Sequence, residues 1–176
     1  MTSWQLFSLH TIAERTGAPI RSLRLWADAG AIQATPETNH SGRGNHRLFP
    51  GLELQIASLL TPLANFDLPI GQMVRLGEVF RRPAGLLPGH ARGLHYQAGE
   101  PEIRRLLDRA AQGIGENWLA IVSASKDLWI EPLCEKDDRS VVRVLREFFP
   151  EGAGRRDAVI MMVDATVRLA GLFDDA

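Results

Sequence analysis

The amino-acid sequence predicts two small folded parts: a mainly α N-terminal part built on a helix-turn-helix, and a small C-terminal part of α/β (α+β) type. Three observations support this prediction. Glycines separate and end two helical patterns near the N-terminus, a Pro/Gly-rich stretch fills residues 81–99, and strand and helix patterns alternate over residues 100–176. We therefore expect one domain at 1–80, a linker at 81–99 and a second domain at 100–176.

The helix-turn-helix is predicted from residues 11–30. A short helix over 11–16 stops at Gly17. Pro19 suits the first turn of the next helix, because its fixed φ fits that position. The second helix runs over 20–29 and ends at Gly30, a typical left-handed cap.

The rest of the first part is predicted as a hairpin and two further helices. Residues 31–34 and 46–49 are two short extended segments around a Gly-rich loop, which indicates a hairpin. Apolar residues at helical spacing indicate a helix over 52–63 and another over 70–76, with a break between them.

The second part mixes both kinds of element. An apolar stripe indicates a helix over 103–114, and residues 141–149 carry a similar amphipathic pattern. Residues 118–123 and 127–132 are predicted as two strands joined by a short turn, and 158–163 as a buried strand. The ending, 166–173, fits either a strand or a helix. We expect this part to serve dimerisation, effector sensing or partner binding.

Charge is distributed unevenly along the chain. The net charge is −1, yet residues 1–82 carry eight arginines, no lysine and six acids, which leaves +2 there and −3 in the remainder. Such a small excess gives no broad positive field, so any binding of nucleic acid must rest on individually placed arginines.

Several classes of protein are not expected. The sequence has no phosphate-binding loop and no dinucleotide fingerprint, so we expect no enzyme activity and no cofactor. His90 and His95 have no cysteine or carboxylate at metal-ligand spacing, so we expect no metal. No apolar run is long enough for a membrane span and no export signal is evident. A single cysteine, Cys134, fits the reducing cytoplasm, where we expect the protein to reside.

Four motifs in one order carry a family resemblance. They are the opening FSLHTIAERTG, the helix SLRLWADAG, the segment HRLF at 46–49, and the helix pair LELQIASLLTPLANFDLPIGQMVRL. Together, residues 7–76 resemble the winged helix-turn-helix of MerR-type transcription regulators. The sequence departs from the family pattern at Leu25 and Ala27, where that pattern has an aromatic residue and an acid.

The resemblance implies a sequence-specific, double-stranded DNA-binding regulator in bacteria that acts as a homodimer. Helix 20–29 would be the recognition helix in the major groove, and the wing, residues 33–48, would lie on the flanking groove or backbone. RNA polymerase is an implied partner, because family members distort promoter DNA for it. The sequence does not identify an effector, and its single cysteine argues against the metal-sensing subtype of the family.

The candidate DNA contacts are arginines and small polar residues on the recognition helix and the wing. Arg21 and Arg24 are three residues apart, so both lie near one side of the helix, and guanidinium groups bind phosphate or guanine. Arg43 lies between two glycines, which allow close approach to another backbone. The full set is Thr16, Arg21, Ser22, Arg24, Arg43, Asn45, His46 and Arg47.

Two alternatives remain open at this point. An excisionase-like or architectural protein of a mobile element would use a similar winged domain to bend DNA. In the other, the helix-turn-helix is degenerate and the chain acts through its C-terminal part as an interaction domain or an enzyme; Leu25 and Ala27 give this alternative weight.

Overall fold

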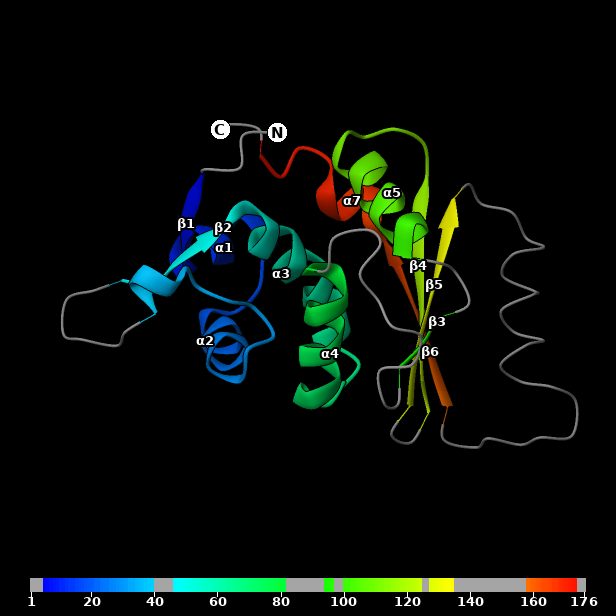
Figure 1. Ribbon diagram of the computed structural model, residues 1–176, viewed down its shortest axis with the longest axis horizontal. Coiled ribbons are helices and arrows are strands. Elements are labelled where there is room, and N and C mark those ends of the chain that lie inside the picture. The colour runs from blue at the N-terminus through cyan, green and yellow to red at the C-terminus, as the bar shows by residue number, and fades with distance from the viewer. Residues whose placement is uncertain are drawn as a thin grey trace, which may run out of the picture. The chain divides into compact units, whose positions relative to one another are not determined.

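The structure, a computed structural model, describes residues 5–39, 46–81, 94–96, 100–124, 127–134 and 158–173. The chain divides into two compact units, Met1–Arg81 and Arg82–Ala176 (Figure 1). Helices combine with a two-stranded and a four-stranded sheet, so the protein is of mixed α+β type, as expected.

The first unit is mainly helical and runs from blue to green in Figure 1. Its elements are β1 (Leu6–Ser8), α1 (Leu9–Thr16), α2 (Ile20–Ala29), the 3-10 turn η1 (Pro36–Thr38), β2 (Leu48–Pro50), α3 (Gly51–Ala64) and α4 (Ile70–Arg81). The core draws on every helix and on β2; among its fully buried side chains are Ile12, Leu23, Phe49, Leu60 and Leu76.

The two predicted N-terminal helices are confirmed, with one shifted start. The side chain of Ser8 accepts a hydrogen bond from the Thr11 amide, so α1 begins at Leu9 rather than Thr11. Gly17 and Gly30 end the two helices with φ angles of 73° and 88°, a conformation that favours glycine. Pro19 is the residue that precedes α2 instead of lying in its first turn.

The predicted pairing of 31–34 with 46–49 is wrong. Strand β2 pairs antiparallel with β1, with Phe7 opposite Phe49, and residues 31–34 form no strand. Both phenylalanines are buried, so this pairing contributes to the core. The backbone at 31–33 is bonded elsewhere, because the Ala31 carbonyl accepts from Arg81 and the Gln33 amide donates to Glu53.

Helices α3 and α4 complete the first unit. Helix α3 is buried along most of its length and ends at Ala64, the first residue of the predicted break at 64–69. Helix α4 continues to Arg81, five residues past the last position of the predicted pattern, because Val79 and Phe80 are also buried.

The second unit is built on a four-stranded sheet. Its elements are β3 (Leu94–Tyr96), α5 (Glu100–Ala111), β4 (Asn117–Ala124), β5 (Asp127–Cys134), β6 (Ala158–Asp164) and α7 (Ala165–Leu169). The strand order is β3-β5-β4-β6; β4 is antiparallel to both neighbours and β3 is parallel to β5. Helices α5 and α7 pack against each other and against β4 (Figure 1).

Most predicted elements of the second unit are confirmed where the structure describes them. The three predicted strands correspond to β4, β5 and β6, and the helix at 103–114 corresponds to α5. The ambiguous ending is helical, since the Asp164 side chain caps α7 by accepting from the Val167 amide. Strand β3 lies inside the segment expected to be a linker, and the helix expected at 141–149 lies outside the described residues.

Candidate nucleic-acid interface

Helix α2 buries one side and presents the other to solvent. Leu23 and Trp26 are 0% and 2% exposed, so this side of the helix packs in the core of the first unit. The opposite side carries an exposed stripe that consists of Ile20, Arg21, Arg24, Leu25 and Asp28. Two arginines that packing leaves in solvent are therefore available to bind an anion.

A hollow of about 520 Å³ lies beside this stripe. It is lined by Ser8, Leu9, His10, Ile20, Arg24, His46 and Arg47. The hollow brings Arg24 of α2 together with His46 and Arg47, which precede β2, although more than 20 residues separate them in sequence. Three of the predicted contact residues thus share one surface.

His10 is a further residue of this surface that sequence reasoning missed. It lies in the first turn of α1 with its side chain 81% exposed, and its Nε2 is 3.3 Å from Oε1 of Glu14. The signal available in the sequence was its position two residues after the capping Ser8. His10 therefore lines the hollow on the side formed by α1.

Arg47 contacts the exposed stripe directly. Its Nη1 donates a hydrogen bond of 2.6 Å to Oδ1 of Asp28. The side chains of Arg47 and Asp28 are 27% and 64% exposed, so the pair is solvated. This contact joins the segment before β2 to α2 and offsets the one acid of the stripe, which would otherwise repel phosphate.

Thr16 does not belong to this surface, which corrects its assignment as a DNA contact. Its hydroxyl donates to the Ile12 carbonyl at 2.7 Å and accepts from the Ala18 amide at 3.2 Å. The residue is only 6% exposed. Its hydroxyl therefore satisfies the backbone at the end of α1.

The other predicted contacts fall into three groups. Arg21, Arg24 and His46 are exposed, and Ser22 is half-buried on the edge of the stripe. Arg43 and Asn45 lie outside the described residues. Arg47 reaches the stripe but is paired there with Asp28.

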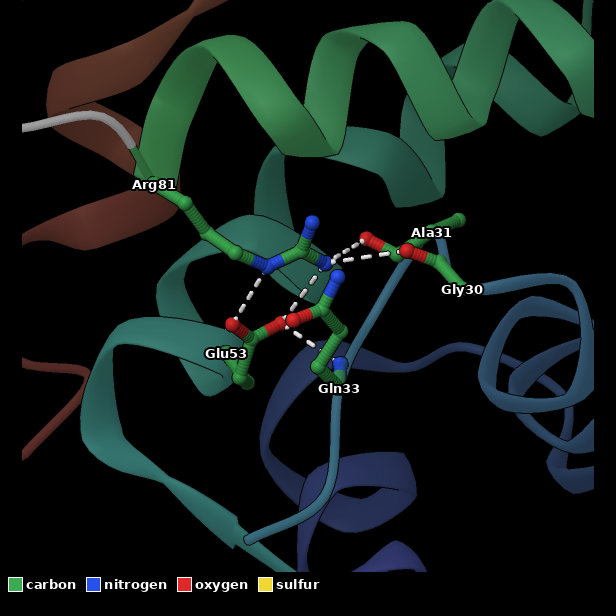
Figure 2. Close-up of polar contacts among 5 residues, drawn as sticks. All are labelled: Gly30, Ala31, Gln33, Glu53 and Arg81. Atoms are coloured by element: carbon green, nitrogen blue, oxygen red, sulfur yellow. Dashed lines mark hydrogen bonds and ion pairs between the residues drawn. The ribbon is translucent and has the colours of Figure 1, made fainter. Parts of the chain in front are cut away.

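A buried ion pair holds the C-terminal end of α2 in place. Arg81 Nε donates to Glu53 Oε1 at 2.7 Å, with the two side chains 14% and 5% exposed (Figure 2). Arg81 Nη2 also donates to the carbonyls of Gly30 and Ala31, while Glu53 Oε2 accepts from the Gln33 amide at 2.9 Å. The last residue of α4 and the first turn of α3 thereby fix the chain where it leaves α2 (Figure 2).

Gly77 allows α4 to pack closely against the backbone of Ala31, at the end of α2. A Cβ atom at this position would overlap the carbonyl oxygen of Ala31, which Arg81 also contacts. Only a residue without a side chain lets α4 approach the end of α2 this closely.

No protein-family model matches the chain, and no curated protein matches it either. In the part of the chain that the structure describes, no helix is long and apolar enough to cross a membrane. Across the same residues, no three side chains of His, Cys, Asp or Glu are grouped so that they could hold a metal ion. We therefore infer function from the geometry and chemistry of the site.

Proposed function

We propose that residues 1–81 form a winged helix-turn-helix domain of the MerR type that binds double-stranded DNA, and that the chain is a bacterial, cytoplasmic transcription regulator. The observation that carries this proposal is the shared surface of Arg24, His46 and Arg47 around the hollow, next to the exposed stripe of α2. A basic helix face flanked by a basic loop segment suits a duplex, which presents a groove between two rows of phosphates.

In this proposal α2 enters the major groove and the wing lies on the flanking groove or backbone. Arg21 is near the start of α2, where recognition helices usually meet base edges, so it would contact bases. Arg24 borders the hollow and would bind a backbone phosphate. His46, and Arg43 and Asn45 on grounds of sequence, would add contacts from the wing.

The buried pair of Glu53 and Arg81 supports this mode of binding. DNA recognition requires the recognition helix and the wing to be held at one fixed spacing. Five hydrogen bonds join these two side chains to one another and to residues 30, 31 and 33, at the junction between α2 and the wing. Such a network makes the interface rigid without relying on bound DNA.

A homodimer is part of the proposal. One short helix contacts few base pairs, and two-fold symmetric DNA sites match two-fold symmetric proteins. Residues 82–176 would supply dimerisation, effector sensing or contact with a partner such as RNA polymerase. That second folded unit favours a regulator over a small excisionase-like protein.

DNA binding by the full chain tests the proposal. In a gel-mobility-shift assay, we expect the protein to bind a duplex from the region upstream of its own gene more tightly than it binds the corresponding single strand. Arg21→Ala and Arg43→Ala should each weaken that binding. Transcription in vitro from the same duplex should change when the protein is added. Equal binding by the wild type and both variants would contradict the proposed site.

A further inference from the structure

Leu25 is an exposed apolar residue on the outer side of α2, the proposed recognition helix. Leu25 is 57% exposed, whereas Leu23 and Trp26 of the same helix are buried. It lies four residues after Arg21 and three before Asp28, so it shares the outer side of α2 with both. Packing within the first unit does not account for a leucine at this position.

The chemistry of leucine limits what it can contact on DNA. Its side chain has no hydrogen-bond donor, so it cannot bind a phosphate as an aromatic hydroxyl would. In the major groove the apolar group that a base presents is the C5-methyl of thymine. Burying an aliphatic side chain against that methyl removes apolar surface of both partners from water.

The neighbouring side chains separate Leu25 from the phosphate-binding side of the helix. Arg24, which borders the hollow, lies on one side of the stripe, and Leu25 lies on the other side, beyond Arg21. Arg21 is placed to bind a guanine or an adjacent phosphate. A thymine next to the base or phosphate that Arg21 contacts is therefore within the same part of the groove.

We infer that Leu25 is a specificity-determining residue that packs against the C5-methyl of a thymine in the major groove, beside the position contacted by Arg21. This inference rests on the proposed function. It assigns to the duplex a chemical requirement, a methyl group at one defined base, in addition to the phosphate contacts of the arginines.

The test removes the methyl group from the DNA and the side chain from the protein. The full chain first selects duplexes from a random-sequence pool of unmodified DNA. Each thymine of the best-bound duplex is then replaced singly by deoxyuridine, which lacks only the methyl group. Dissociation constants are measured for wild type, Leu25→Ala and a control, Phe66→Ala. Phe66 is 55% exposed and lies between α3 and α4.

At one thymine per half-site, deoxyuridine should weaken binding of the wild type and Phe66→Ala about fourfold, because one buried methyl is worth about 0.8 kcal/mol and 1.4 kcal/mol is a factor of ten. Leu25→Ala should bind the unmodified duplex more weakly and be insensitive to that replacement. Alanine is the best helix former, so the variant should fold.

Two results would overturn the inference, and they are distinguishable. If the wild type binds the selected duplex but every deoxyuridine replacement affects wild type and Leu25→Ala equally, Leu25 reads no methyl and DNA binding still stands. If the pool yields no duplex that the chain binds, the proposed function fails and the inference fails with it.

Discussion

Arg47 Nη1 donates a 2.6 Å hydrogen bond to Asp28 Oδ1, which joins the segment before β2 to the exposed stripe of α2. The contact holds an arginine near the proposed DNA but directs its charge to a carboxylate of the protein. Because the Asp28 side chain is 64% exposed, the pair contributes at most about 1 kcal/mol to stability. Its main consequence is that the positive charge of Arg47 neutralises Asp28, the one acid of the stripe.

Replacing Asp28 by alanine should strengthen DNA binding. The change removes an acid that faces phosphate and frees Arg47 for the duplex. We expect a lower dissociation constant, and a salt dependence of binding that is steeper by up to about 0.9 in log–log slope, the value for one added phosphate contact. Fluorescence anisotropy over a series of salt concentrations measures both quantities.

Glu78→Ala is the matched control for this change, because Glu78 is an exposed acid on α4. It removes the same charge from the first unit without freeing an arginine of the interface. Weaker binding by Asp28→Ala than by Glu78→Ala would show that the pair with Arg47 positions the wing, contrary to this account.

Thr16→Val should destabilise the first unit without changing the salt dependence of DNA binding. The substitution leaves the buried Ala18 amide without its acceptor and the Ile12 carbonyl without one donor, at a cost of about 1–3 kcal/mol. Thr16→Ser keeps both hydrogen bonds and should be close to wild type. Hydrogen exchange of α1 amides measures the loss; a shallower salt slope for Thr16→Val would restore Thr16 as a DNA contact.

Glu53→Gln should loosen the junction between α2 and the wing. The variant leaves the buried Arg81 guanidinium without its counter-charge, and breaking a buried pair costs about 3–5 kcal/mol. Exchange of the Gln33 amide should accelerate, and DNA should bind more weakly. Glu78→Gln, which neutralises an exposed acid, should leave both unchanged. Unaltered exchange at Gln33 would show that the pair does not hold this junction.

Gly77→Ala should be destabilising, whereas Gly71→Ala on the same helix should not. The new Cβ at residue 77 overlaps the Ala31 carbonyl, and such overpacking costs about 1–3 kcal/mol. At residue 71 no atom lies within 4 Å of a Cβ, so alanine there should be neutral or stabilising by up to about 1 kcal/mol. Hydrogen exchange over residues 70–81 compares the two, and equal protection would contradict the close approach.

The parts of the fold that local chemistry determines could be predicted from the sequence. Gly17 and Gly30 adopt positive φ where helices were expected to end. Leu23 and Trp26 are buried because they lie on one side of a helix, and that spacing is readable without a structure.

The parts that depend on distant residues could not be predicted. Phe7 and Phe49 face each other across β1 and β2, but no local pattern indicates that partner. Residues 31–34 resemble a strand by composition, yet Glu53 and Arg81 occupy the backbone groups that a strand would need. Thr16 was predicted to be a DNA contact. The sequence does not reveal that its hydroxyl bonds to the backbone of residues 12 and 18, because those bonds depend on the geometry of the turn.

The central claim is that Arg24, an exposed arginine of α2, binds DNA phosphate, and the salt dependence of binding by Arg24→Ala tests it most directly. Arg105, exposed on α5 of the second unit, provides the control variant Arg105→Ala. This account predicts weaker binding by Arg24→Ala and a log–log slope shallower by about 0.9, with Arg105→Ala matching the wild type. The same affinity and slope for Arg24→Ala and the wild type would contradict it.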